Sequence, residues 1–240
     1  MNKEILKGKY LIKISYTSMV FNENKNLHTI EWFCNGILHR DDGPALMKFS
    51  VNNKKQTEKY YRNGILHRDD GPAIIHYGYN ERVTSFVYYM NGEIHRDDGP
   101  AKVSYSLNGN VYVETYYKFD EFNNLGGPTT IFYDDNGFKK TEVWEHNKKK
   151  HRSGGPAYIS YNQKGIDILV HYFEQGVLHN LSGPAVIGKN HAGNIVLKKW
   201  YINGNDKTLE IKKWIKIIGF PKNSEKWTPE QLFVFQMTWI

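Results

Sequence analysis

A loop rich in side chains that could do chemistry occurs three times in this 240-residue chain. The segment NGILHRDDGPA occupies residues 35–45 and again 63–73, and residues 91–101 differ from it at two positions. A histidine beside carboxylates can act in acid–base chemistry or hold a metal ion. An enzyme rarely needs one loop three times, so we expect these side chains to fix loop structure instead. They are His39, Arg40, Asp41, Asp42, Gly43, Pro44, His67, Arg68, Asp69, Asp70, Gly71, Pro72, His95, Arg96, Asp97, Asp98, Gly99 and Pro100.

Catalytic uses of the loop are poorly supported. The His-Arg-Asp triplet also occurs in protein kinases, but the chain has no glycine-rich phosphate loop and no Asp-Phe-Gly motif. We therefore predict no catalytic residue and no enzyme. The rival enzyme hypothesis needs a cleft between the C-terminal segment and the last repeats. Its candidates are His171 and His191, which lie outside the repeated histidine position.

Metal binding by successive loops conflicts with strand spacing. Equivalent positions in neighbouring hairpins lie roughly 10 Å apart. Ligands of one zinc ion lie within about 4 Å of each other. We predict no metal and no cofactor. We expect the aspartates to hold turns, and each loop arginine to pair with an aspartate of the adjacent loop.

A fixed period of 28 residues organises most of the chain. Six Gly-Pro pairs recur at this spacing, with their prolines at Pro44, Pro72, Pro100, Pro128, Pro156 and Pro184. After each pair, apolar residues alternate along a strand, and a turn such as Asn108-Gly109 leads to a second strand. We expect positive φ angles at both residues of such turns. The fold predicted is mainly β: an elongated single-layer antiparallel sheet of six 28-residue hairpin repeats.

The pattern WYxNGxLHRxDGPAxI is nearly complete at 32–47, 60–75 and 88–103. It resembles MORN-type repeat proteins, and specifically a variant with an HRxDGPA signature carried by giant DNA viruses of amoebae. The resemblance covers about residues 18–206. It implies a solenoid of β-hairpins that acts as a scaffold or, in some members, binds acidic lipid. Because this chain has arginine after the histidine and a longer unit, no binding residue is carried over.

The last 34 residues abandon the repeat and predict helices. Residues 208–218 carry apolar side chains at helical spacing, and Gly219 is placed to end that helix. Thr228 and Gln231 form the sequence of a capping box before a helix at about 229–239. We predict a repeat domain over 1–206, which begins with an irregular hairpin at about 8–33. A two-helix cap over 207–240 would cover the exposed sheet edge.

Composition and charge bound the function. The charged first residues are unlike a secretory signal, no apolar run approaches the ~18 residues of a membrane span, and Cys34 has no partner for an internal disulfide. We expect a cytoplasmic protein, in a host cytoplasm or a virion if the chain is viral. The net charge of +7 concentrates at 138–152 and 198–226.

Two binding functions follow from these features. The first is a scaffold that binds a protein through rows of tyrosines on opposite faces of the sheet, one of them exposed. Its candidates are Tyr60, Tyr61, Tyr88, Tyr89, Tyr116 and Tyr117. The alternative is a surface for nucleic acid or anionic lipid. Its candidates are Lys148, Lys149, Lys150, Lys212, Lys213 and Lys216.

Overall fold

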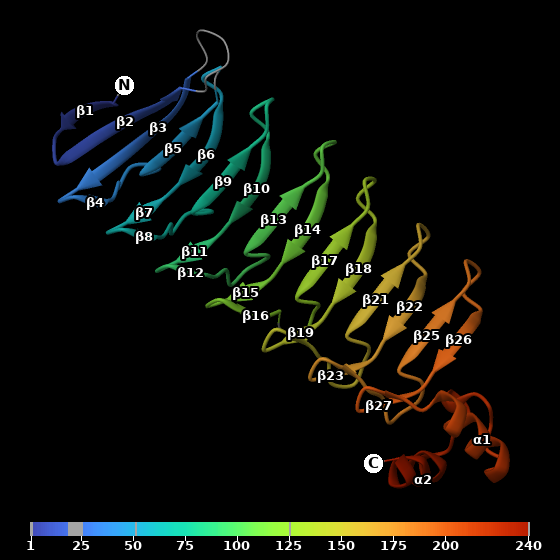
Figure 1. Ribbon diagram of the computed structural model, residues 1–240. Helices are drawn as coiled ribbons and strands as arrows, with labels where there is room; N and C mark the ends of the chain where they lie inside the picture. Colours follow the sequence, from blue (N-terminus) through green and yellow to red (C-terminus); the bar gives the residue numbers. More distant parts are fainter. Residues whose placement is uncertain (1, 19–25, 51, 125, 240) are drawn as a thin grey trace. The chain divides into compact units, whose positions relative to one another are not determined.

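The computed structural model describes residues 2–18, 26–50, 52–124 and 126–239. The chain divides into two compact units, which are described separately. The first unit comprises residues 1–121 and 135–137, and the second comprises 122–134 and 138–240. Antiparallel hairpins make up most of each unit, and two helices end the second, as Figure 1 shows. The prediction of a mainly β fold followed by C-terminal helices is confirmed.

Strands of the first unit follow each other in chain order. The hydrogen-bonded order is β1, β2, β3, β5, β6, β9, β10, β13, β14. Their bounds are β1 (Asn2–Lys7), β2 (Tyr10–Ser18), β3 (Asn26–Cys34), β5 (Leu46–Phe49), β6 (Lys55–Lys59), β9 (Ile74–Tyr77), β10 (Val83–Val87), β13 (Lys102–Tyr105) and β14 (Val111–Thr115). β2 and β3 pair over the region of the predicted first hairpin, and the intervening residues 19–25 lie outside the described part.

The second unit repeats this arrangement before it turns helical. Its long strands are β17 (Thr130–Tyr133), β18 (Lys139–Val143), β21 (Tyr158–Tyr161), β22 (Asp167–His171), β25 (Val186–Lys189) and β26 (Ile195–Lys199). They too pair in chain order. The chain then forms α1 (Thr208–Ile218), the short 3-10 helix η1 (Ser224–Lys226) and α2 (Pro229–Trp239).

A second, very short hairpin follows each long one. These hairpins are β7 (Tyr61–Arg62) with β8 (Ile65–Leu66), β11 (Tyr89–Met90) with β12 (Glu93–Ile94), β15 (Tyr117–Lys118) with β16 (Glu121–Phe122), β19 (Glu145–His146) with β20 (Lys149–Lys150), β23 (Phe173–Glu174) with β24 (Val177–Leu178), and β27 (Tyr201–Ile202) with β28 (Asn205–Asp206). β4 (Ile37–Leu38) pairs in the same way with the end of β3. Asn63 and Gly64 have φ of 51° and 79°, which is the two-residue turn that Asn-Gly favours.

The turns of the long hairpins differ from this expectation. Gly109 has a φ of 91°, but Asn108 keeps a negative φ. The Asn108 side chain accepts a hydrogen bond from the Asn110 N–H at 3.2 Å, and a register shift follows Ser104. The prediction of two positive φ angles was therefore wrong here, because a longer turn with a bulge places only one residue in the left-handed region.

Small side chains form the most buried positions between a loop and the strand that follows it. The alanine after each Gly-Pro pair is fully buried at Ala45, Ala73, Ala101, Ala157 and Ala185. Its carbonyl accepts the N–H of the aromatic residue that ends the preceding long hairpin, as from Tyr60 to Ala73 at 2.8 Å. Thr129 replaces alanine once, and its hydroxyl donates to the carbonyl of Val143. The close backbone contact explains why larger residues are avoided here.

The C-terminal helices have their own small core. Trp200 and Ile202 from the sheet pack with Ile211 and Ile215 of α1 and with Phe235 of α2. Gly219, with a φ of 78°, ends α1 as predicted. The predicted capping box of α2 is confirmed, since Thr228 and Gln231 exchange hydrogen bonds. Within the described chain, no helix has the length and apolar character to cross a membrane.

Candidate functional site

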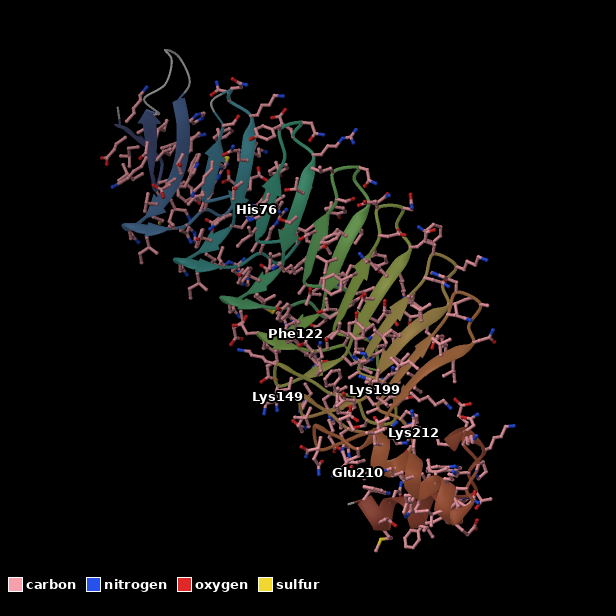
Figure 2. The ribbon with its side chains drawn as sticks, turned by 45° about the vertical axis from the view of Figure 1, so that its right-hand side comes forward. His76, Phe122, Lys149, Lys199, Glu210 and Lys212 are labelled. Atoms are coloured by element: carbon pink, nitrogen blue, oxygen red, sulfur yellow. The ribbon has the colours of Figure 1, made fainter. Side chains whose placement is uncertain are left out.

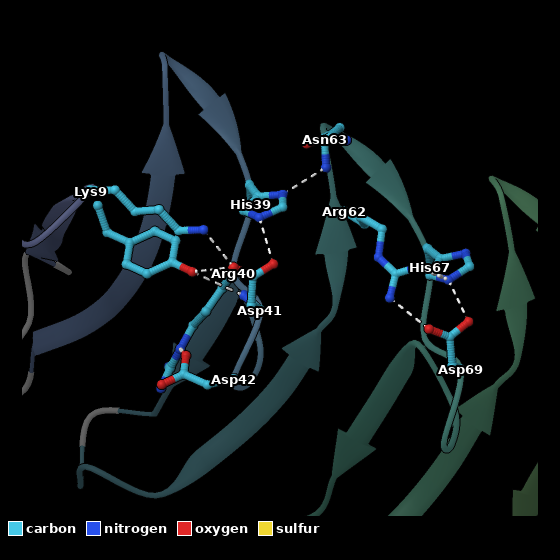
Figure 3. Close-up of polar contacts among 10 residues, drawn as sticks. Lys9, His39, Arg40, Asp41, Asp42, Arg62, Asn63, His67 and Asp69 are labelled. Atoms are coloured by element: carbon cyan, nitrogen blue, oxygen red, sulfur yellow. Dashed lines mark hydrogen bonds and ion pairs between the residues drawn. The ribbon is translucent and has the colours of Figure 1, made fainter.

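The repeated histidine joins one repeat to the next. Nδ1 of His39 lies 3.0 Å from the backbone nitrogen of Asn63, 24 residues further along, and Figure 3 shows this bond. A backbone N–H can only donate, so Nδ1 accepts and its proton must sit on Nε2. The Nε2–H then faces Asp41, at 2.9 Å from Oδ1. Asp41 thus fixes the tautomer and the orientation of the ring that receives the next repeat.

The same bond recurs wherever the repeat keeps its histidine, with one exception. The backbone N–H of the short-hairpin turn donates from Asn91 to His67, from Gln175 to His151 and from Asn203 to His179, at 3.1, 3.4 and 3.0 Å. Nδ1 of His95 has no such partner within the described chain. There Phe119 replaces the turn asparagine and stacks on the His95 ring at 4.1 Å.

The side chain of the loop arginine stays within its own repeat. The Arg68 guanidinium lies 4.0 Å from the centre of the Tyr60 ring, and its Nε donates to Asp70 at 2.7 Å. Arg40, Arg96 and Arg152 stack on Trp32, Tyr88 and Trp144 at 4.0, 4.3 and 4.0 Å. The prediction that the arginines pair with aspartates of the adjacent loop is wrong, because this stacking holds each guanidinium over its own loop.

The first aspartate of each loop collects several donors. Lys9 and Tyr10 donate to Asp41 at 2.7 and 2.9 Å, and Figure 3 shows the contact from Lys9. The hydrogen bond from Lys9, followed by that from Tyr10, lowers the pKa of Asp41 well below its usual value. Arg62 lowers the pKa of Asp69 in the same way. These carboxylates are exposed, so their ion pairs are screened by water and stabilise the fold only weakly.

The polar groups of the loops therefore form hydrogen bonds with one another and with neighbouring repeats. A groove of about 500 Å³ between two successive loops is lined by Arg40, Asp41, His67, Arg68 and Asp69, among others. Each of these five has a hydrogen-bond partner in its own or a neighbouring repeat. Across the described residues, no cluster of three or more histidine, cysteine or acidic side chains could hold a metal ion.

The two histidines of the enzyme hypothesis lie at opposite ends of one strand. His171 pairs with Val186 at the start of β25, whereas His191 follows the other end of that strand. The four residues of β25, at about 3.3 Å per step, separate these levels by about 10 Å or more. His171 contacts the rings of Tyr158 and Phe173. The structure does not bring these two histidines together.

The candidate tyrosines are only half exposed. All six of them, in both rows, are of intermediate burial. Burial raises the pKa of Tyr60, Tyr61 and Tyr89. The expectation that one row would stand exposed on a face of the long sheet is corrected. Tyr61, Tyr89 and Tyr117 begin the short hairpins β7, β11 and β15, which form separate two-stranded sheets.

The candidate lysines fall on two exposed elements of the second unit. Lys148 and Lys149 are exposed in and beside the turn from β19 to β20, while Lys150 extends over the rings of Tyr158 and Phe173. Lys212, Lys213 and Lys216 are exposed on α1. Lys149 and Lys212 are labelled in Figure 2.

A buried carboxylate site was missed by the sequence analysis. Glu58 is buried with its oxygens 2.6 Å from both Lys55 Nζ and the Tyr77 hydroxyl. The same triad recurs as Lys139, Glu142 and Tyr161. Its signal was present, because all three positions shift by the same multiple of the 28-residue period. The closed set of partners points to structural pairing.

Comparison with known proteins found no match among family models, curated proteins or solved structures.

Proposed function

We propose that this protein is a non-enzymatic scaffold or assembly component that binds other proteins, built as a MORN-like solenoid of hairpin repeats. The observation that carries the proposal is the bond by which four of the five repeated histidines accept the turn N–H of the next repeat. This bond gives the histidine, the side chain of the loop best suited to acid–base chemistry, a structural role: it joins one repeat to the next. Such a construction supplies a large preformed surface at little ordering cost.

The partner surface we assign to the scaffold consists of the exposed parts of the tyrosine rows. Half-buried tyrosines are held rigidly, and rigid aromatic side chains contribute strongly to protein interfaces. Tyr61 and Tyr89 occupy the same position of consecutive repeats, at the start of β7 and β11. The resemblance to viral repeat proteins makes the host cytoplasm or a virion the expected setting.

The test is capture of a protein partner at two salt concentrations. We expect capture from host or infected-cell lysate to survive physiological salt and to fall about tenfold in Tyr61→Ser/Tyr89→Ser, since each aromatic anchor is worth about 1 kcal/mol or more. Tyr79→Ser is the matched control, because Tyr79 is 91% exposed in a turn and belongs to neither row. Recovery of only nucleic acid or lipid, lost at higher salt, would refute the scaffold.

The alternative function is binding of nucleic acid or anionic lipid through the lysines of the second unit. The exposure of Lys148, Lys149, Lys212, Lys213 and Lys216 supports it. Phosphate binding by these side chains would weaken steeply between low and physiological salt. Lys148→Glu/Lys149→Glu would then abolish binding, whereas the tyrosine variant would leave it unchanged. An enzyme is the least favoured reading, given the separation of His171 and His191.

A further inference from the structure

The final strand of the sheet, β26, has an open outer edge. Among the described strands it pairs only with β25. The equivalent strand β6 is paired on both sides, and its Thr57, Glu58 and Lys59 lie opposite residues 74–76 of the next repeat. The corresponding positions of β26 are Leu197, Lys198 and Lys199. These three residues thus occupy the positions that would pair with the first strand of a further repeat, and among the described residues no such strand follows.

The helical segment supplies a hydrogen-bond acceptor for the backbone N–H of Trp200, one residue beyond this edge. In earlier repeats the N–H equivalent to that of Trp200 donates to the alanine carbonyl of the next loop. Here it donates to the Thr208 hydroxyl at 3.0 Å. The helices therefore replace the next loop but not the next strand. The expectation that the cap covers the sheet edge is corrected for residues 197–199.

A groove of about 1030 Å³ lies between β26 and α1. On the strand side, Ile195, Val196 and Leu197 are 38%, 68% and 39% exposed. Trp200, Ile215 and Phe220 add further apolar lining. Exposed apolar residues on an unpaired strand edge are avoided in soluble proteins unless something binds there.

The groove carries charge of one sign. Four lysines line it and no carboxylate does: Lys198, Lys212, Lys216 and Lys222. Lys198 donates to the neutral side chain of Asn223 at 2.7 Å, so its charge is not compensated by that contact. Figure 2 shows Lys212 on α1 and Lys199 at the end of β26. An apolar floor with a basic rim matches a ligand of alternating apolar and acidic residues.

We infer that the outer edge of β26 binds an extended acidic segment of another protein by strand addition. The segment pairs antiparallel with residues 197–199, as successive strands do elsewhere in this sheet, and its carboxylates face Lys212 and Lys216. This inference rests on the proposed scaffold function and gives it one partner class. A second copy of the chain fits less well. The other open edge, β1, presents two exposed lysines and one glutamate, and would bring positive charge to a basic rim.

The test measures binding of a short fluorescent peptide of alternating valine and glutamate to the full chain by anisotropy. We expect binding to fall about tenfold in Lys212→Glu/Lys216→Glu, which corresponds to about 1.4 kcal/mol. Lys213→Glu is the matched control, since Lys213 is exposed on the same helix but does not line the groove. Replacing glutamate by glutamine in the peptide should weaken binding, and methylating its backbone nitrogens along one edge should abolish it.

Several results would overturn the inference. Equal binding of the methylated peptide and the unmethylated peptide would exclude strand pairing. A loss of binding in Lys213→Glu as large as that in Lys212→Glu/Lys216→Glu would show that binding depends only on the overall charge of the protein. Concentration-dependent association of the full chain that disappears when β1 is deleted would assign the edge to a second copy. Failure of the peptide while a partner is still lost in Tyr61→Ser/Tyr89→Ser would reject this site and leave the scaffold function standing.

Discussion

Complete and degenerate loops of the same chain preserve different contacts. In the complete loop of residues 67–72, Arg68 stacks on Tyr60, pairs with Asp70, and donates to the carbonyl of Pro72 at 3.4 Å. In the degenerate loop of residues 179–184, asparagine stands at the arginine position. Asn180 donates to the carbonyl of Pro184 at 3.0 Å, and Asn124 does the same for Pro128 at 2.8 Å. The bond to the backbone survives where the stacking and the ion pair do not.

This difference ranks the interactions of the loop. A proline carbonyl that loses its donor costs the fold about 1 kcal/mol or more. An exposed Arg–Asp pair contributes little. The glycine before the proline is kept in both kinds of loop for a steric reason. A Cβ at Gly71 would lie 3.1 Å from Arg68 Cζ, and one at Gly127 would lie 2.5 Å from Asn124 Nδ2. At Gly183 the obstacle is instead Ser224, whose Oγ would lie 2.8 Å from a Cβ.

The largest effect should come from filling the buried alanine site. Ala73→Leu should destabilise the protein by about 3 kcal/mol, because a fully buried site beside backbone cannot expand. Ala73→Thr is the control, since Thr129 occupies this position in the fourth repeat and finds a backbone acceptor. Urea unfolding followed by fluorescence measures both. Equal losses would mean that threonine is tolerated only in the degenerate loop.

Removal of the joining histidine should have the next largest effect. His67→Ala should cost about 2 kcal/mol, because Asp69 and the Asn91 N–H each lose a partner. His95→Ala is matched in burial and in its aspartate contact, but its Nδ1 has no hydrogen-bond partner in the described chain. Its cost should be lower by up to about 1 kcal/mol, because the lost stacking on Phe119 offsets part of the difference. The same unfolding measurement decides, and a cost of His95→Ala above that of His67→Ala would deny the joint any stabilising role.

At the arginine position, the residue of a complete loop can be replaced by the residue that the degenerate loops carry. Arg68→Ala should cost about 1.5 kcal/mol through loss of the stacking and of the carbonyl bond. Arg68→Asn should cost about 0.5 kcal/mol, because the carbonyl bond can be remade as in the degenerate loops. Thermal unfolding of both variants tests this order. A costlier asparagine would show that stacking on Tyr60 is the dominant contact.

The smallest effect concerns the Arg–Asp pair. The hydrogen bond from Arg68 lowers the pKa of Asp70 below its ordinary value of 3.8, so the pair stabilises the fold above that pH. As pH falls through the lowered pKa, the carboxylate is protonated and this stabilisation is lost. Asp70→Asn should therefore have a slightly lower Tm than the parent near neutral pH, and the gap should close in acid. A gap that widened in acid would contradict the pairing.

Much of the fold could be predicted because it depends on local backbone chemistry. Asn63-Gly64 supplies two positive φ angles and fixes a two-residue turn, and the dipeptide does the same at 35–36, 91–92 and 203–204. Thr228 and Gln231 start a helix through bonds within four residues of each other, and Gly219 ends another. The 28-residue spacing of the Gly-Pro pairs then repeats these local choices. No distant partner is needed for any of them.

Tertiary structure decided the partners of the side chains. His39 accepts a hydrogen bond from the N–H of Asn63 only because successive short hairpins lie side by side. The sequence alone did not identify this hydrogen-bond partner. The arginines turned back onto their own loops, since the aromatic ring that holds each guanidinium lies in the same repeat. The β26 edge stays open because α1 begins at Thr208, which satisfies Trp200 before a further strand can pair. Such outcomes depend on the offset between stacked elements, which local propensity does not encode.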